Sequence, residues 1–199
     1  MPELGAVVLA SGESARFGDS DKLLAPFHGK PLLAHALMAL PGDVFIRRLV
    51  VTRGAEAAAL AKSLGFDVLL HDKPDVSDTI RLGIARMRGL DGCLFCVGDQ
   101  PLLRADTVRR LAAAFAAEPA RIVRAAFDGR GGNPVLFPQA LFGELAALAA
   151  GQSGGAVIRA HRELVLPVQA QYALELEDVD TRTDLERLAQ FSSFEKERD

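Results

Sequence analysis

Four short apolar runs recur along the first half of the chain, each followed by a loop and a segment of helical length. The runs are 4–10 (LGAVVLA), 47–52 (RRLVVT), 66–70 (FDVLL) and 93–98 (CLFCVG). The amphipathic or Ala-rich segments that follow them predict helices at about 31–40, 55–64, 78–89 and 104–117. Strands that alternate with helices build βαβ units, so we expect a mostly parallel sheet.

The pattern changes in the second half. The stretch RIVRAAFDGRGGNPVLF (121–137) predicts two strands around a Gly-rich turn, too close for a helical crossover, so we expect an antiparallel departure from the sheet. The remaining expected elements are helices around 138–149 and 154–162, extended segments at 163–169 and 173–180, and a last helix over 181–191. Ser77 or Asp78 is expected to cap the helix at 78–89, and Thr181 the last one.

Composition and charge indicate one soluble domain, 1–199, with a frayed tail at 191–199. The 199 residues are 49% hydrophobic and 25% charged, which is enough chain for one sizeable core. A net charge of -3 without long basic runs argues against nucleic acid or an anionic membrane as a partner. We expect no membrane span and no signal peptide, and therefore a cytoplasmic protein.

Cys93 and Cys96 form a C-x-x-C that could indicate redox or metal chemistry. Because they lie three apart in a buried strand, their side chains should point to opposite faces, so we interpret them as core thiols. The four histidines have no metal-ligand spacing and are expected to be surface or cap residues.

The first apolar run stops at Gly12 and is followed by Arg16, Gly18 and Lys22. A strand, a Gly-rich loop and a helix present backbone N–H groups to phosphate, and the two cations add mobile positive charge. In the alternative reading, the glycines only make turns and the cations are solvated. The spacing fits neither G-x4-G-K-[ST] nor G-x-G-x-x-G.

Four motifs carry a resemblance that spans residues 7 to 185. They are LASGESARFG (9–18) followed by Lys22, GDQPLL (98–103), GRGGNPVLF (129–137) and DVDTRTDL (178–185). In this order they resemble the molybdenum cofactor cytidylyltransferase family, within the MobA-like NTP transferase superfamily. The resemblance implies an α/β fold, a Rossmann-like three-layer αβα sandwich with an antiparallel hairpin in the second half. It also implies transfer of CMP from CTP to molybdopterin with release of pyrophosphate.

The resemblance assigns roles to particular residues. Arg16, Lys22 and Asp99 would be catalytic, because both reactants are anionic and charge neutralisation must do most of the work. Mg²⁺ would be held by Asp99 and Asp180, with Asp178 as the alternative second ligand; each could instead cap a turn or helix. Residues 1–100 would mainly bind the nucleotide, through Leu9, Ala10, Ser11, Gly12, Ser14, Arg16, Gly18, Lys22, Ser77, Thr79 and Gly98. Residues 101–190 would mainly bind the acceptor, through Pro101, Gly132, Asn133 and Pro134, together with Gln100.

Departures from the family pattern leave alternatives open. Asn133 replaces a histidine and Gln152 an aspartate in the acceptor half, and Ser11 stands where cytidylyl enzymes carry Ala and guanylyl enzymes Gly. A nucleotidyltransferase that uses GTP or another NTP with a sugar or polyol phosphate is one alternative. Another is a non-catalytic chaperone that delivers cofactor to a client molybdenum hydroxylase.

Overall fold

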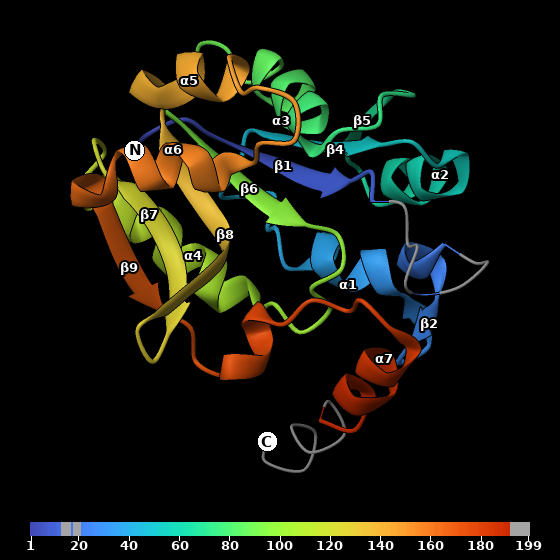
Figure 1. The fold of residues 1–199 in the computed structure, drawn as a ribbon. Coiled ribbons are helices and arrows are strands. Elements are labelled where there is room, and N and C mark those ends of the chain that lie inside the picture. The colour runs from blue at the N-terminus through green and yellow to red at the C-terminus, as the bar shows by residue number, and fades with distance from the viewer. Residues whose placement is uncertain (13–16, 18–20, 192–199) are drawn as a thin grey trace.

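One seven-stranded sheet runs through the whole molecule (Figure 1). This computed structural model describes residues 1–12, 17 and 21–191. The strands are β1 (Leu4–Ala10), β4 (Arg47–Thr52), β5 (Asp67–Leu70), β6 (Gly92–Val97), β7 (Ile122–Phe127), β8 (Arg130–Pro138) and β9 (Val165–Gln169), in the order β5-β4-β1-β6-β8-β7-β9. Strand β1 pairs in parallel with both β4 and β6, whereas β8 is antiparallel to β6 and β7. The structure confirms the mostly parallel sheet and its antiparallel departure.

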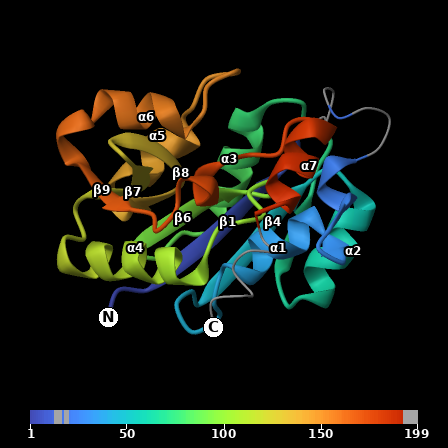
Figure 2. The same ribbon diagram turned by 90° about the horizontal axis from the view of Figure 1, so that it is seen from below.

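Helices cover both faces of the sheet (Figure 2). On one face lie α1 (Leu32–Met38), α2 (Ala55–Ser63) and α4 (Ala105–Ala117); on the other lie α3 (Val76–Ala85), α5 (Phe142–Ala146) and α6 (Gly154–Ala160). Because side chains alternate along a strand, each face has its own core. Cys96 belongs to the first and Cys93 to the second, which confirms that the two thiols point to opposite faces. Burial raises the pKa of Cys96 to about 12 and that of Cys93 well above its usual value.

Helix α3 packs closely against β1 because Gly83 has no side chain. A Cβ atom at Gly83 would lie 2.7 Å from Cγ1 of Val7, which is closer than packed atoms approach. This close approach fixes the beginning of α3 beside the end of β1, where the site is found.

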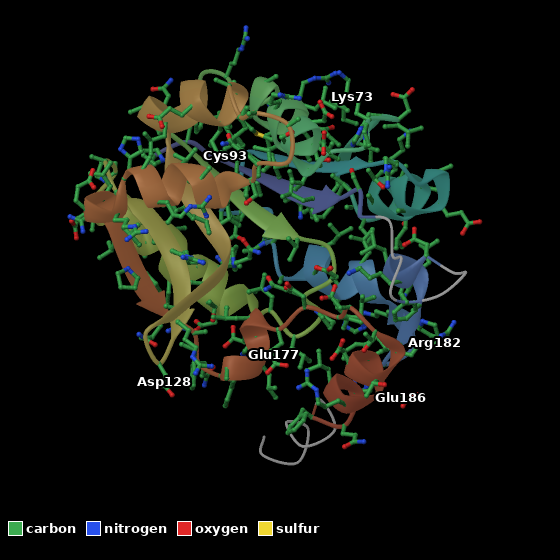
Figure 3. The ribbon with its side chains drawn as sticks, viewed as in Figure 1. Lys73, Cys93, Asp128, Glu177, Arg182 and Glu186 are labelled. Carbon is green, nitrogen blue, oxygen red and sulfur yellow. The ribbon has the colours of Figure 1, made fainter. Side chains whose placement is uncertain are left out.

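The end of the chain returns to its beginning. Helix α7 (Arg182–Ala189) lies beside the small hairpin of β2 (Pro26–Phe27) and β3 (Lys30–Pro31), below the main sheet in Figure 1. A third apolar cluster joins them: Phe17, Phe27, Leu32, Val179 and Leu188. Thr181 is the predicted N-cap, and its hydroxyl accepts the N–H of Asp184 at 3.1 Å. Figure 3 shows Arg182 and Glu186 on this helix.

Some sequence predictions need correction. Neither Ser77 nor Asp78 caps α3, because the helix starts at Val76 and the Ser77 side chain is buried inside it. The segment 173–180 is not extended throughout, since Ala173–Leu176 forms the short helix η4 around the buried carboxylate of Glu175. The predicted helix at 138–149 is divided into the short helix η2 (Gln139–Leu141) and α5. The other short helices are η1 (Lys22–Leu24) and η3 (Arg162–Leu164).

Candidate active site

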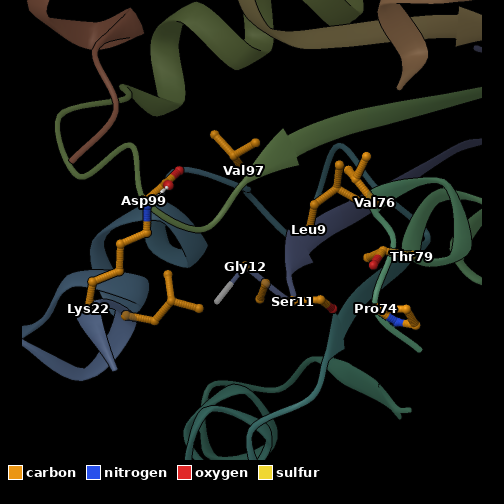
Figure 4. A pocket seen from close by; sticks show the side chains of 11 residues that line it. Leu9, Ser11, Gly12, Lys22, Pro74, Val76, Thr79, Val97 and Asp99 are labelled. Atoms are coloured by element: carbon orange, nitrogen blue, oxygen red, sulfur yellow. Dashed lines mark hydrogen bonds and ion pairs between the residues drawn. The ribbon is translucent and has the colours of Figure 1, made fainter. Parts of the chain in front are cut away.

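A pocket opens where β1 and β6 end side by side (Figure 4). After β1 the chain crosses to β4 on one side, whereas β6 pairs on the other, so the pocket lies at the switch point where open α/β sheets bind ligands. Its lining residues are Leu9, Ala10, Ser11, Gly12, Lys22, Leu23, Pro74, Val76, Thr79, Val97 and Asp99. Figure 4 shows Lys22 and Asp99 together at one end, Pro74, Val76 and Thr79 at the other, and Gly12 and Ser11 between.

The ionic end is built around the ammonium group of Lys22. Its Nζ donates to Oδ2 of Asp99 at 2.6 Å, to the carbonyl of Val179 at 2.9 Å and to Oδ1 of Asp180 at 3.3 Å. The Lys22 side chain is only 10% exposed. Burial works to lower the pKa of Lys22, but the attraction and hydrogen bonds of Asp99 and Asp180 outweigh it and raise the pKa. The lysine therefore stays charged at the pocket wall.

Backbone contacts bring these distant segments together. The N–H of Val179 donates to the carbonyl of Asp99 at 2.9 Å, which ties the segment between η4 and α7 to the loop after β6. On the other side, the carboxylate of Asp21 accepts the N–H of Leu23 at 3.0 Å and caps the short helix that carries Lys22. The apolar cluster that contains Val179 packs this segment against the hairpin of β2 and β3.

Carboxylate oxygens at this end fit a divalent cation. Oδ1 of Asp99 is buried and has no hydrogen-bond partner among the described residues, so one acceptor remains for a ligand. Oδ1 of Asp180 lies 3.3 Å from the same ammonium group. No group of three or more His, Cys, Asp or Glu that could hold a metal occurs in the described part of the chain. Magnesium, however, is usually bound by one or two carboxylates together with substrate phosphates and water.

Asp178 is a third acid beside this pair. Desolvation, together with the negative charges of Asp99 and Asp180, raises its pKa to about 6, although Lys22 and a hydrogen bond from Gln100 oppose the shift. The carboxyl side of the site thus holds more negative charge than Lys22 alone neutralises, which is a suitable environment for a cation.

Polar groups at the opposite end form a second constellation. The hydroxyl of Ser11 donates to the carbonyl of Val51 at 3.1 Å and lies 2.8 Å from Nε2 of His71. The Thr79 hydroxyl lies 3.5 Å from the same ring nitrogen. Position alone could have indicated His71, because it directly follows β5 at the same sheet edge as Gly12 and Asp99.

Gly12 and Gly98 differ in their surroundings. Gly12 is exposed, and a Cβ atom there would meet no atom of the described residues within 4 Å, so on that side its backbone is open to a ligand. Gly98 is buried and does not line the pocket; a Cβ atom there would lie 2.9 Å from Cδ1 of Leu33. Ser77 likewise is buried away from the lining, and its Oγ has no partner among the described residues.

The residues predicted to bind the acceptor lie outside the pocket lining, and two of them meet at Leu176. The side-chain amide of Gln100 donates to the carbonyl of Leu176 at 3.0 Å. A Cβ atom at Gly132 would lie 3.2 Å from Cβ of Leu176. Asn133 and Pro134 follow on β8 and are joined by a cis peptide bond, and Pro101 is buried next to Gln100.

The predicted nucleotide ligands Ser14, Arg16 and Gly18 lie outside the described residues. Sequence reasoning missed Leu23, Val97, Pro74 and Val76 in the lining, and His71 behind it. Leu23 and Val97 are direct neighbours of motif residues, which was a usable signal. Pro74 lies in the loop before α3, and Val76 is the first residue of that helix. No helix in the described ranges is long and apolar enough to cross a membrane.

Solved structures share this architecture. The crystal structure of Rv0371c from Mycobacterium tuberculosis H37Rv matches with a TM-score of 0.78 and 27% identity over 94% of this chain and 98% of that one. A second structure of Rv0371c is a complex with manganese, with a TM-score of 0.75 and coverage of 95% and 99%. The fold and the switch-point pocket define a nucleotidyltransferase of the Rossmann-like nucleotide-sugar transferase class.

Sequence comparison gives the family. The profile of the MobA-like NTP transferase domain matches residues 6–165. A molybdenum cofactor guanylyltransferase from Cupriavidus taiwanensis is 31% identical over 161 residues, which cover 77% of this chain and 78% of that protein. The bifunctional protein GlmU of Nitrobacter hamburgensis is 37% identical over 131 residues, but the chain spans only 27% of its length. The chain belongs to the MobA-like NTP transferase family.

Proposed function

We propose that this enzyme transfers CMP from CTP to molybdopterin and releases pyrophosphate. The observation that carries the proposal is the meeting of Lys22, Asp99 and Asp180 on one side of the open Gly12 backbone. A cation, a free carboxylate oxygen and an exposed backbone are what an incoming triphosphate needs for binding and charge neutralisation. The molybdopterin acceptor is supported by the molybdenum cofactor guanylyltransferase relatives.

The two ends of the pocket suit the two ends of a nucleotide. The triphosphate would lie along Gly12 toward Lys22, where the charge is. The base would lie between the apolar side chains of Val76 and Leu9 and the hydroxyls of Ser11 and Thr79. Arg16 would add a second cation to the phosphates, as the family motif implies.

Catalysis in this proposal is mainly positioning and charge neutralisation. A phosphate oxygen of the acceptor attacks the α-phosphorus in line with the leaving pyrophosphate, and no covalent enzyme intermediate is required. Lys22 would neutralise negative charge on the α-phosphate oxygens as the acceptor oxygen attacks, while the electron pair of the breaking bond leaves with pyrophosphate. We propose that Asp99 and Asp180 hold Mg²⁺, which when bound screens several phosphate oxygens at once. The manganese complex of Rv0371c supports a divalent ion in this fold.

We propose that the acceptor binds in the region around Leu176. Gln100 holds this segment beside Asp178, and Gly132 packs on it, so an acceptor there would approach the pocket from the side of Asp99. Asn133 and Gln152 are polar where the family pattern has His and Asp. They would have to bind the acceptor without a full charge.

Pyrophosphate release from each of the four NTPs, measured with Mg²⁺ and molybdopterin, tests the proposal. We expect release with CTP, and none with CTP for the Asp99→Ala variant. Exchange of Lys22 for Met should lower kcat more than it raises KM. Turnover with GTP alone would contradict the choice of base, and no turnover with any NTP would contradict the whole proposal.

GTP is the second candidate donor. The observation in its favour is that the molybdenum cofactor relatives named above are guanylyltransferases. The same assay decides between the two bases. A client that matures in the presence of Asp99→Ala would instead favour a delivery chaperone for a molybdenum hydroxylase.

A further inference from the structure

The hydroxyl group of Ser11 has its hydrogen-bond directions fixed by two neighbours. It donates its only proton to the carbonyl of Val51 at 3.1 Å. The 2.8 Å contact with Nε2 of His71 must therefore be one in which the ring donates and the hydroxyl accepts.

The other ring nitrogen of His71 requires the same proton position. Nδ1 accepts the backbone N–H of Lys73 at 3.2 Å, so it carries a lone pair and the neutral ring has its proton on Nε2. The backbone N–H of His71 donates to the carbonyl of Thr52 at 3.1 Å and holds the residue at the end of β5. Lys73 lies on the loop between β5 and α3 (Figure 3). Two independent contacts thus assign one tautomer.

Thr79 completes the arrangement on α3. Its hydroxyl lies 3.5 Å from the carbonyl of Asp75, to which it donates, and 3.5 Å from Nε2 of His71. The side chain is buried and lines the pocket. As in Ser11, the proton is directed at the main chain and the ring N–H faces the oxygen.

We propose that His71 is a positioning residue for base selection, which keeps the protons of Ser11 and Thr79 on main-chain carbonyls. At this end of the pocket the hydroxyl oxygens of Ser11 and Thr79 then accept hydrogen bonds from a base, and neither of these two hydroxyls donates to it. Such a wall suits a base edge that carries an amino group and repels one that carries a carbonyl. The inference rests on the proposed nucleotide site, and it distinguishes cytosine from uracil, which have the same shape and differ at this edge.

The electrostatic surroundings agree with a neutral ring. Burial is the main reason that the pKa of His71 is lowered, and the positive charges of Arg53 and Lys73 add to the effect, against Asp72 and Asp78. A protonated Nδ1 would also face the N–H of Lys73, where two donors meet.

Two substitutions of His71 separate positioning from simple structural support. His71→Gln places an amide N–H2 near the position of Nε2, so it can still donate to Ser11. His71→Asn keeps an acceptor for the N–H of Lys73 but is too short to reach Ser11. Binding of CTP and UTP is measured by titration calorimetry with Mg²⁺ and without an acceptor, and GTP against ITP gives the same comparison for a purine.

We expect the wild type to bind the nucleotide with the amino-bearing base more tightly than its carbonyl counterpart. In His71→Asn the ratio of the two dissociation constants should fall roughly tenfold, which corresponds to the loss of one hydrogen bond. His71→Gln should retain most of it, and Ser11→Ala should resemble His71→Asn. An unchanged preference in His71→Asn, or an equal loss in both His71 variants, would overturn the inference and leave the proposed function standing. Failure of the wild type to bind any of the four nucleotides would overturn both.

Discussion

Nζ of Lys22 lies 2.6 Å from Oδ2 of Asp99, a residue 77 positions further along the chain. The pair joins the short helix η1 to the loop after β6, and both side chains line the same pocket. An ion pair that is mostly buried needs further hydrogen bonds to offset the loss of water. Here the carbonyl of Val179 supplies one of them.

The first prediction concerns Asp99. Asp99→Asn keeps the shape and one hydrogen bond to Lys22 but removes the negative charge, so kcat should fall by roughly 10²-fold or more. The pKa of Lys22 should also fall, because burial is then less opposed. Steady-state kinetics at saturating Mg²⁺ measures the first effect. Glu186→Gln, an exposed change on α7, is the matched control and should leave kcat unchanged.

A second prediction uses Gly12, whose Cα faces open space and whose backbone lies outside the left-handed region. Gly12→Ala should change the free energy of unfolding by less than about 0.5 kcal/mol, since the methyl group meets no atom of residues 1–12, 17 or 21–191 within 4 Å. A triphosphate that contacts this backbone should bind roughly tenfold more weakly. Calorimetric titration with nucleotide and urea unfolding measure the two effects.

Gly98→Ala is the comparison for that experiment. Its methyl group would press on Leu33, so unfolding should become easier by about 1–3 kcal/mol. If Gly12→Ala bound nucleotide as tightly as the wild type, the open backbone would have no role in binding.

The third prediction concerns Glu175, a buried carboxylate that organises the segment before Asp178. Oε1 accepts the N–H groups of Gln171 and Tyr172 at 2.9 and 3.1 Å, and Oε2 accepts the Thr107 hydroxyl at 2.6 Å. In Glu175→Gln an amide N–H2 faces one set of these donors, so the free energy of unfolding should fall by about 1–3 kcal/mol.

Urea unfolding measures this change. Glu177→Gln is the control, because its ion pair with Arg187 is at the surface and is expected to contribute less than about 1 kcal/mol. If the two substitutions lowered the free energy of unfolding equally, the buried hydrogen bonds of Glu175 would contribute no more stability than the surface ion pair of Glu177.

The fourth prediction is a pH dependence of stability. The pKa of His71 in the folded protein is lowered from 6.5 by burial first and then by Arg53. Below about pH 6.5 the unfolded chain takes up a proton that the folded ring resists, so the stabilisation present above pH 6.5 is lost as the pH falls.

His71→Gln removes this contribution and should therefore flatten the decrease in Tm between about pH 7.5 and 5.5. This interval brackets the ordinary histidine pKa of about 6.5. Part of the decrease should remain, because burial also lowers the pKa of His35. An unchanged slope in His71→Gln would contradict the prediction.

The sequence predicts much of the first half because its signals are local. Apolar runs and Gly-rich turns mark the strands and the loop, and an acid directly after a buried strand places Asp99 at the carboxyl edge of the sheet. The hairpin of β2 and β3 cannot be predicted in this way, since strands of two residues are too short to show an alternation of apolar and polar residues.

Long-range contacts could not be predicted in the same way. The motif names Asp180 as a candidate, but its position beside Lys22 depends on α7 packing against Phe17 and Phe27, more than a hundred residues away. The sequence predicts His71 only as a surface or cap residue, because no metal-ligand spacing includes it. Its ring contacts Ser11 after β1 and Thr79 on α3, and its N–H donates to Thr52 at the end of β4, which only the assembled sheet shows.

The return of α7 to the beginning of the chain has a consequence for biosynthesis. Lys22 and Asp99 leave the ribosome long before Asp180 and the helix behind it. A nascent chain that has just completed β6 therefore holds the lysine and the first carboxylate without the second. On the proposed metal site, which includes Asp180, the pocket is complete only after α7 has been synthesised and has packed against Phe17 and Phe27.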